Sequence, residues 1–172
     1  MSELDITLRE ATPKDAKILL ETMAILDKET PFLLVNQQSL KLKPSDMAEQ
    51  LDFIYEQENQ LILLAFNHEE LIGVATVMGE MDAPLRHIGE IGISILKEYW
   101  GYGLGSIMLE EIILWAKEAN LIKRLEIKVQ ARNERALHLY QKMAFESEGI
   151  IRRGFLSEDN EYLDIVLMSY LL

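Results

Sequence analysis

Cysteine is absent from this 172-residue sequence. Its absence excludes disulfides, thiolate metal ligands and a covalent cysteine nucleophile, and it is typical of a reducing compartment. Long hydrophobic runs are also missing, since no apolar stretch reaches the roughly 18 residues that would span a bilayer. The first five residues, Met1 to Asp5, lack the basic start and apolar centre of a signal peptide. We therefore expect a cytoplasmic protein with no membrane partner.

Positive charge is scarce, with 17 Lys and Arg against 29 Asp and Glu and a net charge of −12. This balance argues against general nucleic-acid binding, so we expect no nucleic-acid partner. The charge is uneven: residues 121–153 hold eight basic and four acidic residues, whereas residues 1–120 hold nine and 21. The basic segment could contact a phosphate-rich ligand while the acidic remainder attracts a cationic second substrate. A solvated surface of mixed charge is the simpler interpretation for most of these side chains.

Secondary-structure signals divide the chain without any linker or repeat, which predicts a single domain over residues 1–172. Thr12 with Pro13, Pro44, Gly103 and Asn133 are each typical of a position where a helix begins. The predicted order is β-α-α-β-β-β-α-β-α-β-β, an α/β (α+β) fold with a mixed sheet and helices on both faces. Residues 31–43 have no period and are expected to form a loop, either a substrate contact or a plain connection. The expected strands are 6–9, 61–66, 71–78, about 86–95, 125–129, about 148–156 and 162–171.

Glycine gathers in one stretch, Trp100-Gly101-Tyr102-Gly103-Leu104-Gly105-Ser106, between an apolar strand and an apolar-periodic helix. Main-chain N–H groups that no Cβ obstructs, together with the positive end of the helix dipole, favour phosphate. A Walker phosphate loop would need a lysine after the last glycine, where Ser106 stands. The dinucleotide fingerprint would need a third glycine where Ser106 or Met108 stands. A main-chain cradle for a pyrophosphate remains.

Two motifs now resemble one family, the GNAT superfamily of N-acetyltransferases. Residues 100–105 are similar to its acetyl-CoA motif Gln/Arg-x-x-Gly-x-Gly/Ala, with Trp100 at the first position. Residues 133–145 are similar to its segment Asn-x-x-Ala-x-x-Leu-Tyr-x-Lys-x-Gly-Phe, with Ala144 in place of the glycine. The Tyr-Trp-Gly-x-Gly run resembles the branch with ribosomal-protein N-terminal and small-amine acetyltransferases. The resemblance covers nearly the whole chain and implies a mostly antiparallel sheet of about seven strands flanked by about four helices.

The resemblance also implies acetyl-CoA as co-substrate, no metal, and direct attack of a primary amine on the thioester in a ternary complex. The glycine turn would hold the pyrophosphate, and the strand before it would lie beside the pantetheine arm, splayed from the strand that starts near Arg124. A backbone N–H near Ile93 would polarise the thioester carbonyl. The residues that the resemblance assigns to the cofactor are Ile93, Ser94, Ile95, Trp100, Gly101, Tyr102, Gly103, Leu104, Gly105, Ser106, Asn133, Tyr140 and Lys142.

Two side chains are candidates for proton transfer. By the resemblance, Tyr140 would be the general acid beside the leaving sulfur, although a buried aromatic on the apolar face of its helix is the alternative. Glu90 is the candidate general base, because an alkylamine is mostly protonated at neutral pH, and a solvent-facing strand glutamate is the alternative. His87 is a second, weaker candidate for the base. Arg132, Arg135 and Lys142 could meet the nucleotide phosphates, and a plain surface role is the alternative for at least some of them.

The acceptor is expected to be a small-molecule amine or a protein N-terminal amine, since no motif in residues 27–43 or elsewhere narrows it. A second hypothesis of another class is a non-catalytic acyl-CoA-binding or regulatory module on the same scaffold, which would need neither Glu90 nor Tyr140. The family also suggests a homodimer, in which the apolar segment 162–172 could pair or pack across subunits.

Overall fold

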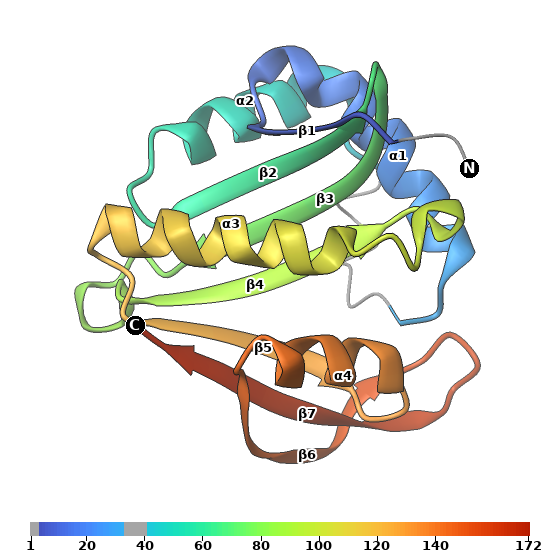
Figure 1. The fold of residues 1–172 in the computed structure, drawn as a ribbon, viewed down its shortest axis with the longest axis vertical. Coiled ribbons are helices and arrows are strands. Elements are labelled where there is room, and N and C mark those ends of the chain that lie inside the picture. The colour runs from blue at the N-terminus through green and yellow to red at the C-terminus, as the bar shows by residue number, and fades with distance from the viewer. Residues whose placement is uncertain (1–3, 33–40) are drawn as a thin grey trace.

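The computed structural model describes residues 4–32 and 41–172. Its helices and strands follow the predicted order, so the fold-class prediction is confirmed (Figure 1). Most of the predicted loop at 31–43 lies outside the described residues. The elements are β1 (Ile6–Glu10), α1 (Ala16–Glu29), α2 (Pro44–Tyr55), β2 (Gln60–Asn67), β3 (Glu70–Gly79), β4 (Ile88–Ile95), α3 (Leu104–Ala119), β5 (Arg124–Gln130), α4 (Glu134–Lys142), β6 (Glu146–Leu156) and β7 (Tyr162–Leu171).

The strands form one seven-stranded sheet in the order β1-β2-β3-β4-β5-β7-β6. Its neighbouring strands are antiparallel except β4 and β5, which run parallel. Both edges of β7 are paired within the chain, to β5 and to β6. The predicted pairing of residues 162–172 across subunits is therefore wrong for the main chain of β7, because the β6–β7 hairpin already uses its second edge. The homodimer itself stays a prediction.

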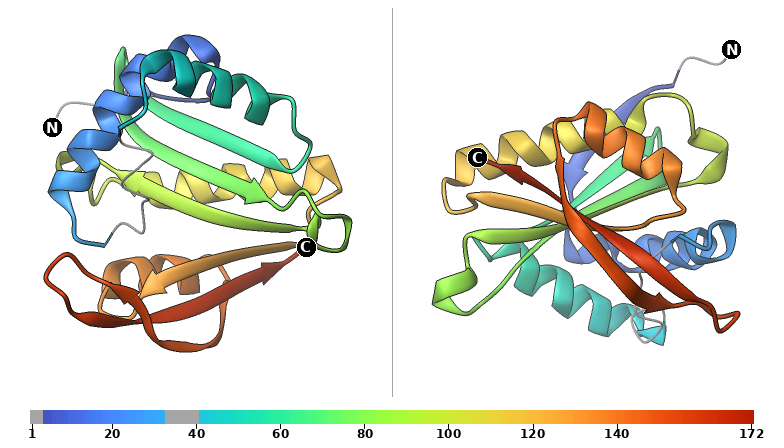
Figure 2. Two further views of the ribbon diagram at one scale, coloured as in Figure 1. Left: turned by 180° about the vertical axis from the view of Figure 1, so that it is seen from behind. Right: turned by 90° about the horizontal axis from the view of Figure 1, so that it is seen from below.

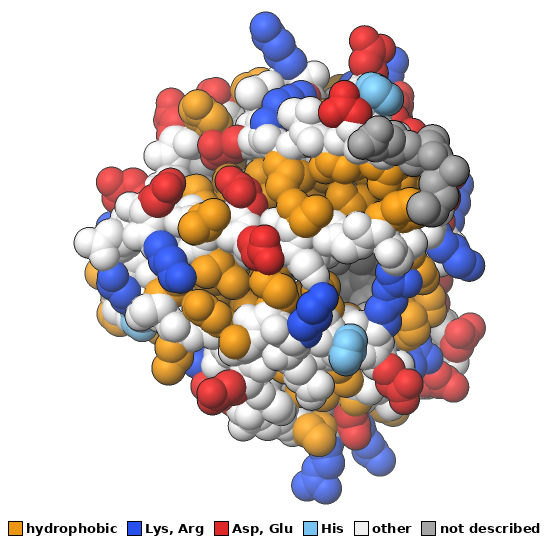
Figure 3. All heavy atoms as spheres, in the orientation of Figure 1, with side chains coloured by type: hydrophobic (Ala, Val, Ile, Leu, Met, Phe, Trp, Pro, Cys, Tyr) orange, Lys and Arg blue, Asp and Glu red, His pale blue; other side chains and the backbone are white. Residues whose placement is uncertain are grey.

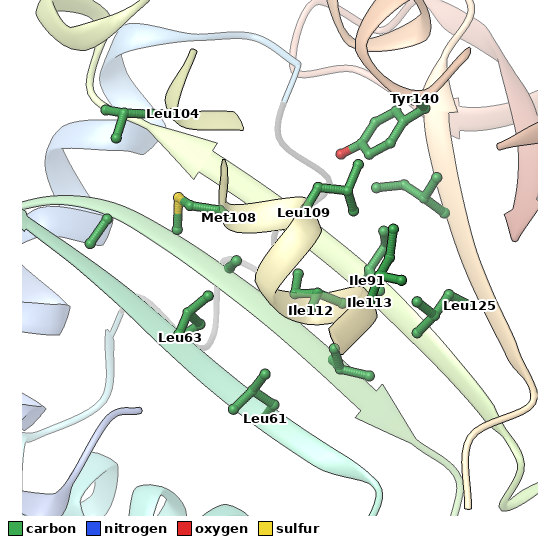
Figure 4. Packing of buried hydrophobic residues seen from close by; sticks show 14 of the residues in the cluster. Leu61, Leu63, Ile91, Leu104, Met108, Leu109, Ile112, Ile113, Leu125 and Tyr140 are labelled. Atoms are coloured by element: carbon green, nitrogen blue, oxygen red, sulfur yellow. The ribbon is translucent and has the colours of Figure 1, made fainter. Parts of the chain in front are cut away.

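Helices cover both faces of the sheet, α1 and α2 on one and α3 and α4 on the other (Figures 1 and 2). The side chains of β2 explain the two cores, because alternate residues of a strand point to opposite faces. Leu61 and Leu63 pack in the cluster with α3, whereas Ile62 and Leu64 pack in the cluster with α1 and α2. Figure 4 shows α3 contributing Leu104, Met108, Leu109, Ile112 and Ile113 to the first cluster.

A partly buried ion pair, with Asp15 buried and Arg9 44% exposed, holds the start of α1. The guanidinium of Arg9 donates to both carboxylate oxygens of Asp15, at 2.8 and 2.7 Å, and the N–H of Thr12 donates to one of them at 2.8 Å. The Arg9 hydrogen bonds, with a smaller contribution from Thr12, lower the pKa of Asp15 to about 2, although burial opposes the shift. Among the described residues, no helix is long and apolar enough to cross a membrane.

Candidate active site

The parallel strands β4 and β5 separate part of the way along their length. Their ladder has three pairs, ending at Glu90 opposite Glu126. Beyond that point β4 stays paired with β3 as far as Ile95, and β5 stays paired with β7 as far as Gln130. The two strands therefore diverge toward the N-terminal ends of α3 and α4, as the resemblance predicts (Figures 1 and 2).

The divergence exposes one edge of the β4 main chain. The N–H of Leu96 donates to the carbonyl of Ile72 on β3 at 2.9 Å, whereas the carbonyl of Ile95 accepts from the indole Nε1 of Trp100 at 2.8 Å. Successive strand residues turn their N–H and C=O groups to opposite edges. The N–H and C=O of Ile93 consequently face the split, where β5 no longer pairs with β4. Such an edge can pair with an extended ligand that carries amides.

A cavity of about 650 Å³ lies at the split, within the usual range for small-molecule and cofactor sites. Its walls come from α1, β3, β4, β5 and α4. The cavity brings together five of the residues predicted for the site: Glu90, Ile93, Ser94, Asn133 and Tyr140. The described residues that line it do not include Ile95, the glycine turn or Lys142, which is the last residue of α4. The predicted residues thus fall into a cavity group and a turn group along one split.

The three glycines of the turn have different physical reasons to be glycine. Gly101 and Gly103 have φ of +86° and +79°, a left-handed conformation that side chains disfavour, and a Cβ on either would meet nothing within 4 Å. At Gly105, a Cβ would lie 2.9 Å from Leu139 Cδ2 of α4. The first two glycines therefore shape the open turn, and the third permits close packing of α3 against α4.

The N-terminus of α3 presents main-chain donors at this turn. Gly103 occupies the N-cap and offers no capping side chain. The first intrahelical bond of the helix runs from the N–H of Ile107 to Gly103 O at 3.2 Å, so residues 104–106 have no helical carbonyl to donate to. The side chain of Leu104 is buried in the core (Figure 4), and that of Tyr102 is exposed. The turn therefore fits a pyrophosphate through its main chain.

Trp100 stands where the family motif has Gln or Arg, and it connects the glycine turn to both β4 and α4. Its Nε1 donates to Ile95 O at 2.8 Å, and the guanidinium of Arg135 on α4 lies 4.6 Å from the centroid of its ring. The turn is thereby anchored to β4, and a cation is held beside the turn. Figure 3 shows basic side chains beside a hollow between the N-terminal end of α3 and α4.

Tyr140 lines the cavity from α4. It is 3% exposed, and its ring packs edge-on against Phe145 with 5.6 Å between centroids. Burial raises the pKa of Tyr140, so its hydroxyl keeps its proton at neutral pH. Figure 4 shows this hydroxyl directed from α4 toward α3 and β4. Nearby, Asn133 caps α4 by accepting from the N–H of Ala136 at 3.2 Å, which confirms the predicted helix start.

Glu90 also lines the cavity, where it forms an ion pair that the sequence does not reveal. Lys128 Nζ lies 3.0 Å from Glu90 Oε2, and the two side chains are 42% and 51% exposed. This bond to Glu90 is the main cause that raises the pKa of Lys128, which therefore stays an ammonium. From the sequence, alternation along β5 predicts that Lys128 and Glu126 share a face of the sheet. It does not predict the contact with Glu90, because that contact depends on which strand lies next to β5.

A second residue missed from the sequence is Gln130, which is 1% exposed and forms part of the cavity wall. Its Nε2 donates to Pro31 O at 2.9 Å, and its Oε1 accepts from Arg132 Nε at 2.9 Å. The guanidinium of Arg132 also lies over the ring of Phe32, and its Nη1 is 3.5 Å from Glu161 Oε2. Arg132 therefore contacts the cavity wall near Phe32, and its contact with the phosphates stays a prediction.

His87, the second candidate for the base, is not among the described residues that line the cavity. Its carbonyl accepts from the N–H groups of Lys123 and Arg124 at the start of β5. Within residues 4–32 and 41–172, no group of three or more His, Asp or Glu side chains is arranged to hold a metal ion.

Comparison with known proteins identifies the class to which this fold and site belong. Residues 22–145 match the Acetyltransferase (GNAT) family, and the chain therefore belongs to this family. Among curated proteins, the chain is 26% identical over 175 residues to the uncharacterized N-acetyltransferase p20 of Bacillus licheniformis, covering 96% of this chain and 92% of that protein.

Solved structures agree with this assignment. A GNAT-family acetyltransferase from Streptococcus pneumoniae is 37% identical with a TM-score of 0.94, covering 98% of this chain and all of that one. The fold is shared with yncA from Salmonella typhimurium, whose structure was solved with its cofactor acetyl-CoA (15% identity, TM-score 0.84, covering 97% and 94%). It is also shared with ribosomal-protein-alanine N-acetyltransferase from Brucella melitensis (22%, TM-score 0.83, covering 96% and 99%).

Proposed function

We propose that this protein transfers an acetyl group from acetyl-CoA to a primary amine, by direct attack of the amine in a ternary complex. The observation that carries the proposal is the cavity at the β4–β5 split, which is lined by a carboxylate, Glu90, and a protonated phenol, Tyr140. Family membership and the acetyl-CoA complex of the Salmonella relative support the choice of co-substrate.

The turn and strand would hold the cofactor mainly through main-chain groups. Gly101 and Gly103 give the turn its open shape, and the N–H groups of residues 104–106 bind the pyrophosphate, with the Arg135 cation held nearby by Trp100. The exposed edge at residues 93–95 pairs with the pantetheine amides. Asn133 and Lys142 are the further predicted contacts, from the two ends of α4.

The chemistry is divided between two proton-transfer groups and one main-chain donor. Acetyl-CoA supplies the acetyl group as an activated thioester. Glu90 takes a proton from the acceptor ammonium, and the N–H of Ile93 stabilises negative charge on the carbonyl oxygen. Tyr140 donates its proton to the leaving sulfur, a role for which a pKa raised by burial is suited because the phenol stays protonated.

The test is release of free CoA with a panel of amines. Because the chain has no cysteine, a thiol reagent reports CoA without background from the protein. We expect release that depends on the amine, with large losses in Glu90→Gln and Tyr140→Phe. Tight acetyl-CoA binding by calorimetry, with no release for any amine, would favour the non-catalytic binding module instead.

Assembly and location remain predictions beside this activity. We expect a cytoplasmic homodimer, for which β6 is available as an edge strand of the sheet that the described residues form. Light scattering that gives the mass of a monomer would contradict the dimer.

A further inference from the structure

The Glu90–Lys128 ion pair lines the cavity in which acetyl transfer is proposed to occur. Glu90 is the last residue of β4 paired with β5, and Lys128 follows two residues beyond its partner Glu126. Side chains two residues apart share a face, so Lys128 lies on the same face as Glu126 and its partner Glu90. Because the adjacent Ile91 and Ile127 pack in the cluster with α3, Glu90 and Lys128 belong to the face covered by α1 and α2. Both line the cavity, and each is about half exposed. The pair can therefore open without disturbing the core.

The charges around this pair are unequal. Among the described residues that line the cavity, Lys128 is the single basic one, and Glu80 and Glu90 are the acidic ones. Glu126, which also acts on Lys128, already accepts from Arg124 Nε at 2.9 Å. An acceptor ammonium that binds Glu90 must displace the Lys128 ammonium. The displaced Lys128 would then have only the carboxylate of Glu126 nearby, which Arg124 already engages.

An acceptor that carries both an ammonium and a carboxylate would leave neither Glu90 nor Lys128 without a partner. Its ammonium replaces Lys128 on Glu90, and its own carboxylate binds the displaced Lys128, so one ion pair is exchanged for two. When a bound acceptor covers these two half-exposed side chains, exchange keeps the charge of the cavity constant and leaves neither of them unpaired. An amine without a carboxylate cannot do this. The adjoining wall has apolar side chains from α1 and the segment after it, among them Leu19, Met23 and Phe32.

We propose that Lys128 is a specificity residue that binds a carboxylate next to the acceptor amine, and that the acceptor is an α-amino acid with an apolar side chain. This inference rests on the proposed acetyl transfer and narrows its substrate class. A protein N-terminus lacks the adjacent carboxylate, and its use as the preferred acceptor would contradict the inference.

The experiment compares matched acceptors by CoA release. L-Leucine, L-methionine and L-phenylalanine are each compared with the corresponding amide and with a peptide that begins with the same residue. We expect kcat/KM for the free acid to exceed that for the amide by about 10- to 100-fold, the range for a hydrogen-bonded charge, mainly through KM. Lys128→Met should reduce the acid-to-amide ratio to about one, and Lys128→Arg should keep part of it.

Lys123→Met is the matched control, because Lys123 is an exposed lysine that donates to Asn120 and does not line the cavity. It should keep the wild-type ratio. Three results would overturn this inference while leaving the proposed acetyl transfer intact: equal rates for acid and amide, a preference for the peptide, or an acid-to-amide ratio that Lys128→Met leaves unchanged. Absence of CoA release with every amine, despite acetyl-CoA binding, would overturn the proposed function together with it.

Discussion

The proposed site has a cofactor half and an acceptor half, which are built from different parts of the protein. The cofactor half consists of the turn at residues 100–106, the N-terminus of α3 and the facing helix α4. The acceptor half consists of Glu90, Lys128 and Gln130 on the sheet together with the α1 side of the cavity. Main-chain groups dominate the first, and side chains from segments far apart in sequence dominate the second.

This difference predicts that the two halves tolerate change differently. A main-chain cradle requires only that φ angles and helix packing be kept, so its motif is short and local. A constellation of side chains depends on which strands are neighbours and on which residues share a face. We therefore expect variants in the acceptor half to change catalysis and acceptor choice, and variants in the cofactor half to change acetyl-CoA binding.

The largest effect is expected in the acceptor half, from Glu90→Gln. Loss of the proton acceptor should lower kcat/KM for amines by about 10²- to 10⁴-fold, the usual contribution of a general base. The Kd of acetyl-CoA, measured by calorimetry, should stay within about twofold. Glu118→Gln, at an exposed position on α3, is the control for charge. A rate for Glu90→Gln above a tenth of wild type would remove Glu90 from the mechanism.

A smaller effect is expected from Asp15→Asn, which acts on the acceptor half through the start of α1. Because Arg9 holds the pKa of Asp15 at about 2 instead of its ordinary 3.8, the carboxylate stabilises the folded state above about pH 4. That contribution is lost as the pH falls from about 4 to about 2. The shift corresponds to about 2 kcal/mol of unfolding free energy at pH 7.

Urea unfolding of Asp15→Asn and wild type at pH 7 and at about pH 3 checks the sign. The difference in unfolding free energy should be largest at pH 7 and should shrink at the lower pH. Asp159→Asn, in the turn between β6 and β7, is the control. Since α1 carries Leu19 and Met23 of the cavity wall, KM for the acceptor should rise while acetyl-CoA binding stays the same. A difference independent of pH would argue against the Arg9–Asp15 pair as the cause.

Much of the cofactor half could be predicted from the sequence, because its information is local. The spacing of Gly101 and Gly103 predicted the open turn, and Asn133 predicted the start of α4. The close contact that requires Gly105 could not be predicted, because Leu139 lies more than thirty residues away in the chain. The fold was predictable for a similar reason, since hairpins and helix starts are read from neighbouring residues.

The loop at residues 31–43 was a candidate substrate contact, and its Phe32 lines the cavity. Among the single side chains of the acceptor half, only Glu90 could be predicted. Its ion pair with Lys128 crosses two strands that are 38 residues apart, and the contact of Gln130 with Pro31 crosses 99 residues. No spacing in the sequence encodes such contacts, because they follow from the strand order. The pairing of residues 162–172 was misjudged for the same reason, since apolar composition does not tell which edges of a strand are already used.

In the cofactor half, Gly103→Ala tests the left-handed conformation. A methyl group at φ +79° costs about 1–2 kcal/mol, and acetyl-CoA binding would have to restore that conformation in the variant. The Kd of acetyl-CoA should rise by about 5- to 30-fold, and kcat at saturation should change little. Gly149→Ala is the matched control, because a Cβ there also meets nothing within 4 Å and its φ is not positive. Equal Kd values of acetyl-CoA for both variants would show that the conformation of the turn does not contribute to cofactor binding.

The smallest effect is expected at Trp100, where two replacements separate its two contacts. Trp100→Phe removes the hydrogen bond to Ile95 O but keeps a ring beneath Arg135, and it should lower the unfolding free energy by about 1 kcal/mol. Trp100→Leu removes the ring as well, so the Arg135 guanidinium is no longer held beside the turn. The Kd of acetyl-CoA should rise about twofold in the first variant and further in the second. If both variants bind acetyl-CoA equally, Arg135 does not act on the cofactor through Trp100, and the main chain of the turn accounts for binding in this half.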